Sequence, residues 1–194
     1  MKIGSIGYNY IHDLKKENFV MDRPKGPGAV LLLFIKTPAL FRIKEQEYHV
    51  SENSYILISR DSPCYYTGTG DVYTDDWIYF ENEYWDKQFI DKLGIPMDVP
   101  VYLGEMDELS HLVHILVFEH YSGAIHSEEI ERNYIDILFL TLSRTLKSQR
   151  LLSSRQLSEK HYRLTQIRTL IMTMPDRVGN IDNLAAEAGM SRSG

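Results

Sequence analysis

The residues with the clearest chemistry lie in the segment 75–80. Because side chains alternate between the two faces of a β-strand, Asp75, Trp77 and Tyr79 fall on one face. The opposite face then carries Asp76, Ile78 and Phe80. Carboxylates and phenols bond hydroxyl groups, and an indole stacks on the apolar C–H face of a sugar ring. If the first face points inward, the pattern predicts a wall that binds a sugar or a similar polyol.

The sequence lacks the usual signatures of catalysis. It has no Gly-x-Ser-x-Gly elbow and no phosphate loop, and the stretch 68–70 (Gly-Thr-Gly) lacks the third glycine of a dinucleotide site. The single cysteine, Cys64, is interpreted as an inert buried thiol. His111 and His114 lie one helical turn apart without a third ligand, which is typical of a helix surface. We therefore expect a protein that is not an enzyme and has no cofactor or metal.

Length and composition indicate a globular chain. The 194 residues, 43% hydrophobic and 25% charged, suffice for one well-packed domain and a smaller second part. The most apolar run, Ala29–Ile35, is too short to span a bilayer, and the N-terminus lacks the apolar core of a signal peptide. One cysteine cannot form an internal disulfide. These features predict a cytoplasmic protein without a membrane partner.

Residues 1–100 consist of short β-like runs. The runs are rich in Val, Ile, Tyr and Phe, and Pro, Gly, Asn and Asp separate them at regular intervals. They are Ala29–Ile35, Ala39–Ile43, Glu47–Val50, Ser54–Ile58, Cys64–Thr67 and Asp76–Phe80. Many short strands predict a sandwich or a small barrel.

Helical periodicity begins at about Asp107. A first helix is expected from there to about Tyr121, ended by Gly123, and a second from near Ser127 to about Lys147. Both helices carry apolar residues on two sides, which predicts one face on the β-domain and one on a second subunit of a homodimer. The alternative is that both faces belong to the core of a monomer. The polar residues 151–158 are interpreted as an interdomain linker.

The segment 180–194 has the pattern of a helix, a turn and the start of a second helix. Asn180 is a good N-cap, Gly189 suits a left-handed turn, and Ser191 can cap the next helix. This order is typical of a helix-turn-helix, whose second helix enters the DNA major groove. Ser191, Arg192 and Ser193 would then begin the DNA-binding helix, which the chain does not complete. The alternative is an ordinary helical hairpin.

The charge distribution bears on the same question. The net charge is −6, with −7 on residues 1–158 and +1 on residues 159–194. An acidic body repels phosphate. We therefore expect the first 158 residues to form a domain for ligand sensing or subunit assembly. The DNA contacts are expected to lie mostly beyond Gly194.

The residue pattern of the C-terminal segment resembles the first helix-turn-helix of the arabinose-operon regulator (AraC) family. The matching residues are Leu184-Ala185, Gly189-Met190-Ser191 and Ser193. The β-region is similar to the cupin-type effector domain of that family, most closely in the stretch 75–80 followed by Tyr84-Trp85. Two turns depart from the family pattern, at Thr37-Pro38 and at Asn53-Ser54.

The resemblance implies an α+β chain in four parts. A cupin-like β-sandwich or barrel of jelly-roll type would occupy residues 1–100, and amphipathic dimerisation helices residues 101–150. A linker would follow at 151–158, and the start of an all-α helix-turn-helix domain at 159–194. Some cupins are metal enzymes with paired His, Glu and a later His as ligands. Here a lone His49 and Cys64 stand in those zones, so the set is absent.

The resemblance also implies a ligand site. Its wall would fall on Lys36, Tyr66, Asp75 and Trp77, with Asp75 in place of a family histidine and so with a different hydroxyl pattern. The alternative is that Trp77 is ordinary barrel core, Tyr66 a surface strand residue and Lys36 a solvated charge.

An N-terminal arm, residues 8–23, is expected to fold over the ligand, with Tyr10, His12 and Arg23 as contacts. The function implied is a transcription regulator that responds to a small-molecule effector, predicted to be a sugar, and that acts on promoter DNA as a homodimer. The alternative is a cupin-type ligand-binding or dimerisation module that never binds DNA.

Overall fold

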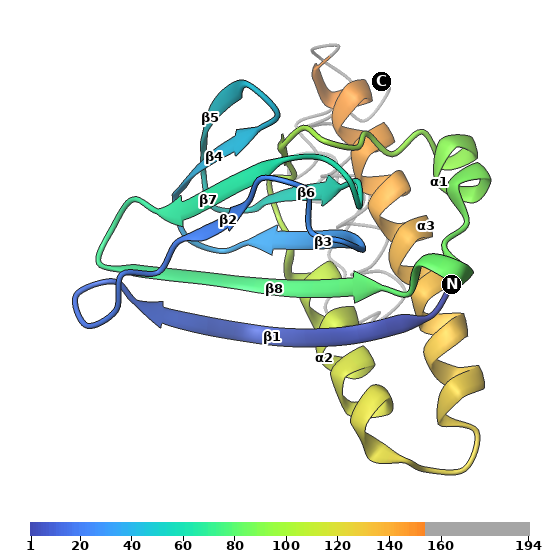
Figure 1. Ribbon diagram of the computed structural model, residues 1–194. Helices are drawn as coiled ribbons and strands as arrows, with labels where there is room; N and C mark the ends of the chain where they lie inside the picture. The colour runs from blue at the N-terminus through green and yellow to red at the C-terminus, as the bar shows by residue number, and fades with distance from the viewer. Residues whose placement is uncertain (154–194) are drawn as a thin grey trace, which may run out of the picture. The chain divides into compact units, whose positions relative to one another are not determined.

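The computed structural model describes residues 1–153, whose strands form two antiparallel sheets (Figure 1). Sheet A has the strand order β1 (Ile3–Asp13), β8 (Val72–Phe80), β3 (Val30–Ile35), β6 (Ser54–Ile58) and β9 (Val101–Tyr102). Sheet B has the order β2 (Met21–Arg23), β7 (Cys64–Gly68), β4 (Ala39–Ile43) and β5 (Gln46–Val50). With the helices that follow, this arrangement confirms the predicted α+β class.

Alternate residues of β3 supply two separate cores. Leu31, Leu33 and Ile35 point into the core between the two sheets. Leu32 and Phe34 point the other way, into a core that sheet A shares with the helices. Because both faces of β3 are buried, its sequence is an uninterrupted apolar run instead of an alternating one.

The helices lie against the outer face of sheet A (Figure 1). They are α1 (Lys87–Leu93), α2 (Asp107–Ser122) and α3 (Ser127–Ser153), with a short 3₁₀ turn η1 (Asn82–Tyr84) before α1. Gly123, with φ of 59°, ends α2 in the predicted left-handed conformation. The helix α3 continues beyond its predicted end at Lys147 to Ser153, so the first residues of the expected linker are helical.

The N-terminal residues form an edge strand, which corrects part of the expected arm. Strand β1 pairs with β8 from Ile3 to Asp13. A bulge interrupts the pairing between Gly7 and Tyr10, and Asn9 within it has φ of 46°. Glycine and asparagine weaken the β signal here, but Ile3 and Ile6 are buried in the helix-side core and hold the strand in place.

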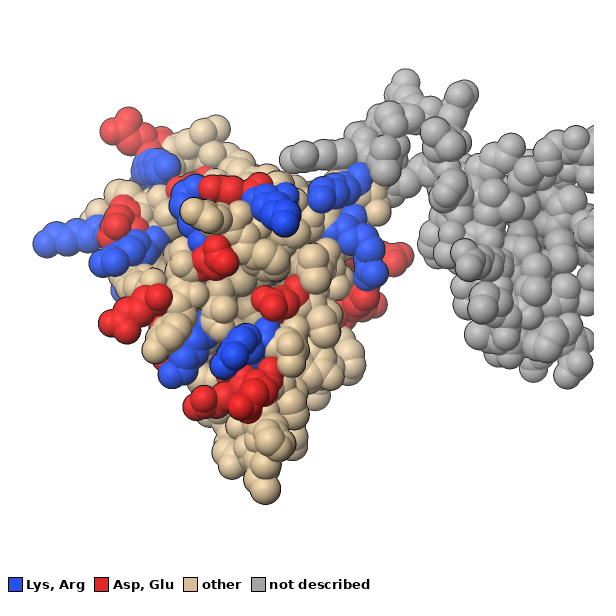
Figure 2. All heavy atoms as spheres, turned by 90° about the vertical axis from the view of Figure 1, so that its right-hand side faces the viewer, with Lys and Arg blue, Asp and Glu red and all other residues tan. Residues whose placement is uncertain are grey.

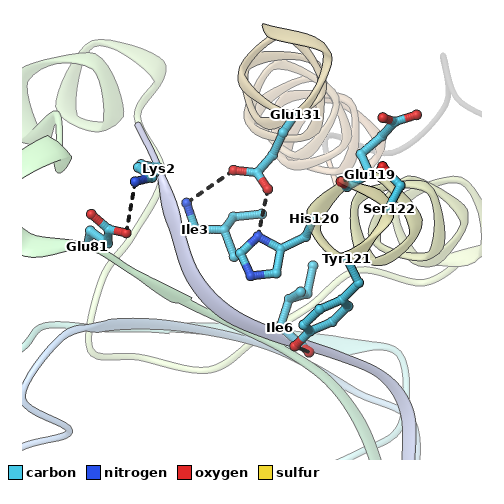
Figure 3. Close-up of polar contacts among 9 residues, drawn as sticks. All are labelled: Lys2, Ile3, Ile6, Glu81, Glu119, His120, Tyr121, Ser122 and Glu131. Carbon is cyan, nitrogen blue, oxygen red and sulfur yellow. Dashed lines mark hydrogen bonds and ion pairs between the residues drawn. The ribbon is translucent and has the colours of Figure 1, made fainter. Parts of the chain in front are cut away.

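Polar contacts fasten the start of β1 to the two long helices (Figure 3). The carboxylate of Glu131 on α3 lies 3.5 Å from the Ile3 backbone N–H and 2.7 Å from Nδ1 of His120 on α2. The hydroxyl of Tyr121 donates to the Ile6 carbonyl at 3.2 Å. Because Glu131 is only 8% exposed, these bonds satisfy a carboxylate that would otherwise be costly to bury. Strand β1, α2 and α3 are therefore connected directly.

Residues Met1–Leu146 form one compact unit. None of the described helices is long and apolar enough to cross a membrane. Residues 154–158 of the expected linker and the whole helix-turn-helix segment lie outside the described residues. The four-part domain scheme therefore stays a prediction.

Candidate ligand site between the sheets

Strand β8 directs a row of polar and aromatic side chains toward sheet B. Tyr73 belongs to the core between the sheets, and Trp77 and Tyr79 pack against that core. Asp75 shares their side of the strand by alternation, and its carboxylate bonds Tyr73. Ile78 and Phe80 lie in the helix-side core. This arrangement agrees with the alternation expected from the sequence, and Tyr73 adds a phenol that the sequence analysis did not include.

The carboxylate of Asp75 is buried and only half satisfied. Its residue is 3% exposed, and Oδ2 accepts a hydrogen bond of 2.8 Å from the hydroxyl of Tyr73. Among the described residues, Oδ1 is the buried side-chain oxygen or nitrogen that has no hydrogen-bond partner. Burial raises the pKa of Asp75 to about 7, against the opposing effect of the Tyr73 bond. An unpartnered buried acceptor is costly, so Oδ1 is suited to a donor from a ligand.

Tyr66 and Tyr73 line the same interior as neutral phenols. Both are almost fully buried, and burial raises the pKa of each well above its usual value. Tyr66, on β7, stacks on Phe41 of β4 with 4.8 Å between the ring centroids. Tyr66 is therefore an interior residue, and the alternative of a surface strand residue is wrong.

The indole of Trp77 lies across the inner face of β1. A Cβ atom at Gly7 would sit 2.8 Å from Cζ2 of Trp77 and closer still to Nε1, so the absent side chain makes room for the ring. Trp77 also meets Tyr79 and Tyr10 edge-on, at centroid distances of 5.8 and 6.4 Å. Because Tyr10 is 51% exposed, this aromatic group lies where the interior meets solvent.

The end of β1 and the segment that follows it pack aromatic rings against the same interior. His12 stacks on Phe19 at 3.6 Å between centroids, and Phe19 stacks on Tyr73 at 5.3 Å. Nδ1 of His12 is 2.9 Å from a carboxylate oxygen of Glu17, and Thr67 donates to the Phe19 carbonyl at 2.8 Å. Phe19 was missed because it begins a short apolar run, Phe19-Val20-Met21, that is too short to show a period of alternation.

Two of the expected ligand residues lie elsewhere. The ammonium of Lys36 is 2.6 Å from Asp76 and 4.4 Å from the centre of the Tyr8 ring, on the helix side of sheet A. The structure therefore does not bring Lys36 into the wall. Arg23 is exposed on β2 and donates to the Asp22 carbonyl at 3.3 Å. Burial raises the pKa of Tyr79, and the positive charge of Arg23 opposes that rise.

The cysteine and the histidines of α2 form no reactive or metal-binding site among the described residues. Burial raises the pKa of Cys64 to about 11, so its thiol stays protonated at neutral pH. Within residues 1–153 no cluster of three or more His, Cys, Asp or Glu is placed to hold a metal ion. The side chains of His111 and His114 are exposed on α2. The expected DNA-binding residues Ser191, Arg192 and Ser193 lie outside the described residues.

No family model and no curated protein matches the chain. Solved structures resemble it at a distance. The plu4264 protein of Photorhabdus luminescens is 18% identical, with 34% of this chain and 55% of that chain covered and a TM-score of 0.30. This chain thus spans about half of that protein.

Two further likenesses cover most of this chain. ToxT of Vibrio cholerae, solved with a bound unsaturated fatty acid, is 10% identical over 99% of this chain and 72% of that one, with a TM-score of 0.41. The AraC-like transcriptional activator CuxR is also 10% identical, over 90% of this chain and 64% of that one, with a TM-score of 0.43. Likenesses this weak leave function to be argued from the residues themselves.

Proposed function

We propose that the described residues are the sensing part of a ligand-responsive transcription regulator of AraC type, in which a sugar binds between the two sheets. The observation that carries the proposal is the free Oδ1 of Asp75, enclosed by aromatic side chains. A buried acceptor without a donor raises the free energy of the empty protein. A ligand hydroxyl that donates to Oδ1 removes that cost, so the site favours a ligand with donors.

The surrounding rings favour a sugar over other donors. Trp77 and Tyr79 follow Asp75 in the same row of β8, and their flat faces suit the C–H face of a pyranose. Tyr66 and Tyr73 are neutral phenols that accept or donate to further hydroxyls. The combination of one carboxylate, two phenols and an indole matches a polyol with one apolar side.

We assign the DNA contacts to the segment from Glu159 onward. That segment carries the helix-turn-helix pattern and a net charge of +1, whereas residues 1–158 carry −7. Figure 2 shows acidic and basic side chains interspersed among the described residues of the face that carries α1 and α3. A mixed surface of this kind gives DNA phosphates no extended basic area to bind. Ser191, Arg192 and Ser193 would begin the helix that enters the major groove.

We also propose that a second copy of the chain covers the outer face of α2 and α3. Ile137 and Leu140 of α3 are 44% and 51% exposed, and Phe118 of α2 is 71% exposed. Nη2 of Arg144, one helical turn after Leu140 in this apolar strip, donates to both carboxylate oxygens of Glu108 at 2.8 and 3.0 Å and joins the two helices. A strip with both charges at its edge is complementary to itself, as a two-fold interface requires.

A thermal-unfolding panel tests the sensing role. The full chain is heated with monosaccharides, disaccharides, sugar alcohols and small organic acids at millimolar concentration. A sugar present at about 100 times its dissociation constant should add about 2.7 kcal/mol of stability and raise the midpoint by several degrees. Trp77→Ala should abolish the shift, whereas Trp85→Ala, whose ring packs on the helix side, should keep it. A panel without any shift would contradict the sugar proposal.

Light scattering tests the dimer. Leu140→Glu places a charge in the apolar strip and should convert a dimer into a monomer at micromolar concentration. Glu129→Gln, at an exposed residue of the first turn of α3, is the matched control and should remain dimeric. A wild-type chain that is monomeric at all concentrations would refute this part of the proposal.

A further inference from the structure

The residue next to Asp75 is the centre of a buried polar network on the other face of sheet A. Asp76 is fully buried, and both of its carboxylate oxygens are bonded. Oδ1 accepts from the Asn9 backbone N–H at 2.7 Å and lies 2.6 Å from Nζ of Lys36. Oδ2 accepts from the hydroxyl of Ser110, on α2, at 2.8 Å. We call these four residues, Asn9, Lys36, Asp76 and Ser110, the Asp76 network.

The Asp76 network holds the bulge of β1. A bulge removes one residue from the ladder of strand pairing, and here the N–H of Asn9 is bonded by Asp76 instead of by β8. The side-chain oxygen of Asn9 accepts from the Lys36 ammonium. Beside it, the Tyr8 ring lies under Lys36 and stacks on His114 of α2 at 4.6 Å. Loosening the network would therefore free the bulge and the first half of α2 together.

Asp75 and Asp76 also share a counter-charge. Asp75 pairs in register with Ile35, the residue directly before Lys36. Asp76 raises the pKa of Asp75 and Lys36 lowers it, after the larger effects of burial and of the Tyr73 bond. The two carboxylates thus repel each other across one strand, and Lys36 stabilises both. Both carboxylates are almost fully buried, so solvent and salt screen this interaction little.

We propose that this adjacent pair reports occupancy of the inter-sheet site to the helices, with Asp75 as the ligand-facing member and Asp76 as the member that holds β1 and α2. This inference rests on the ligand site proposed above. A donor bonded to Oδ1 of Asp75 favours the ionised form of that carboxyl, as the Tyr73 bond already does. Lys36 is then shared between two full negative charges, and its attraction for Asp76 weakens relative to the empty site. Ligand binding therefore loosens the bulge of β1 and the start of α2.

Amide hydrogen exchange on the full chain tests the coupling without any ligand. Asp75→Asn keeps the shape of the side chain and removes its charge, which is the opposite of the change that a bound donor causes. The variant should slow exchange of amides in residues 107–114 of α2 and 7–10 of β1 by about twofold or more, as expected for residues coupled through one network. Amides 39–43 of β4, in sheet B, are the internal control and should not change.

The decisive comparison adds Ser110→Ala, which removes the bond from α2 to Asp76. In that background Asp75→Asn should no longer slow exchange in α2. Equal slowing with and without Ser110, slowing at every amide including β4, or no slowing at all would each overturn the proposal. If Asp75→Asn does not fold, Tyr73→Phe provides the same test, because loss of its donor favours the neutral form of Asp75. A sugar panel that finds nothing would leave this result intact, so the two proposals fail separately.

Discussion

Two neighbouring carboxylates on opposite faces of β8 differ in how fully they are hydrogen-bonded. Asp75 and Asp76 are 3% and 0% exposed, and each sits in a largely apolar core. Asp76 has hydrogen bonds on both oxygens and an ammonium at 2.6 Å. Asp75 has one phenol donor and one oxygen without a partner. Burial alone therefore does not distinguish a structural carboxylate from one that is available to a ligand.

The difference lies in which groups the fold brings to each side. The helix side offers a bulge N–H, a lysine and a serine, so the cost of burying Asp76 is offset. The side between the sheets offers mostly rings and aliphatic carbons, so Asp75 keeps a raised pKa of about 7. The proposed ligand site depends on the oxygen of Asp75 that this side leaves without a partner.

The largest difference in stability between the two faces should come from removing Asp76, the fully hydrogen-bonded carboxylate. Asp76→Ala leaves the Lys36 ammonium, the Asn9 N–H and the Ser110 hydroxyl without their shared partner. We expect the free energy of unfolding in urea at pH 7 to fall by about 3–5 kcal/mol. Asp75→Asn is the matched change on the other face and should not destabilise at that pH. A loss below about 1 kcal/mol for Asp76→Ala would remove the contrast.

The second prediction concerns pH. The pKa of Asp75 is about 7 in the folded chain and near 3.8 in an unfolded one, so the folded state holds the extra proton between those values. The stability that Asp75 contributes is therefore fully present below about pH 4 and is lost as pH rises through about 7. The total change is on the order of 4 kcal/mol. Urea titrations from pH 4 to 8 should show this slope in the wild type and not in Asp75→Asn.

The control for the pH experiment is Asp61→Asn, whose side chain is 79% exposed. That variant should keep the slope of the wild type, because a solvated carboxylate has a similar environment in both states. An identical slope in Asp75→Asn and in the wild type would show that Asp75 does not hold the extra proton.

A smaller loss of stability should follow from adding a side chain in the space that the Trp77 indole occupies. Gly7→Ala places a methyl group 2.8 Å from Cζ2 of Trp77, well inside contact distance, and should cost about 1–3 kcal/mol by overpacking. Gly4→Ala, on the same strand, meets its nearest atom at 3.5 Å, which is ordinary contact, and should be nearly neutral. Equal stabilities for the two variants in urea would show that the Trp77 ring moves aside at no cost.

The sequence predicted the parts of this molecule that depend on local periodicity. The alternation around Trp77 gave the correct faces of β8, and the end of α2 at Gly123 followed from its left-handed preference. The same alternation applied to Ile35 would have placed Lys36 on the helix side, and applied to Asp75 it would have added Tyr73. The wrong placement of Lys36 and the omission of Tyr73 therefore arose because the alternation was not extended to these residues, although the sequence shows it.

Other features had no local signal. Strand β1 was missed because Gly4, Gly7 and Asn9 interrupt its apolar pattern, while its stability comes from pairing with β8, a strand distant in the sequence. The partners of Asp76 are 67 and 34 residues distant in the chain for Asn9 and Ser110. Their meeting depends on the packing of α2 against sheet A, which residue types alone do not specify.

The most direct measurement of the central claim is a carbon-detected NMR titration of the Asp75 carboxyl in the full chain. Comparison with the spectrum of Asp75→Asn identifies its signal. A buried carboxylate with one free oxygen should titrate with a pKa of about 7 in the sugar-free chain. A midpoint near 4 would mean that Asp75 is solvated or fully bonded, and it would contradict the assignment of this residue as the open acceptor of the ligand site.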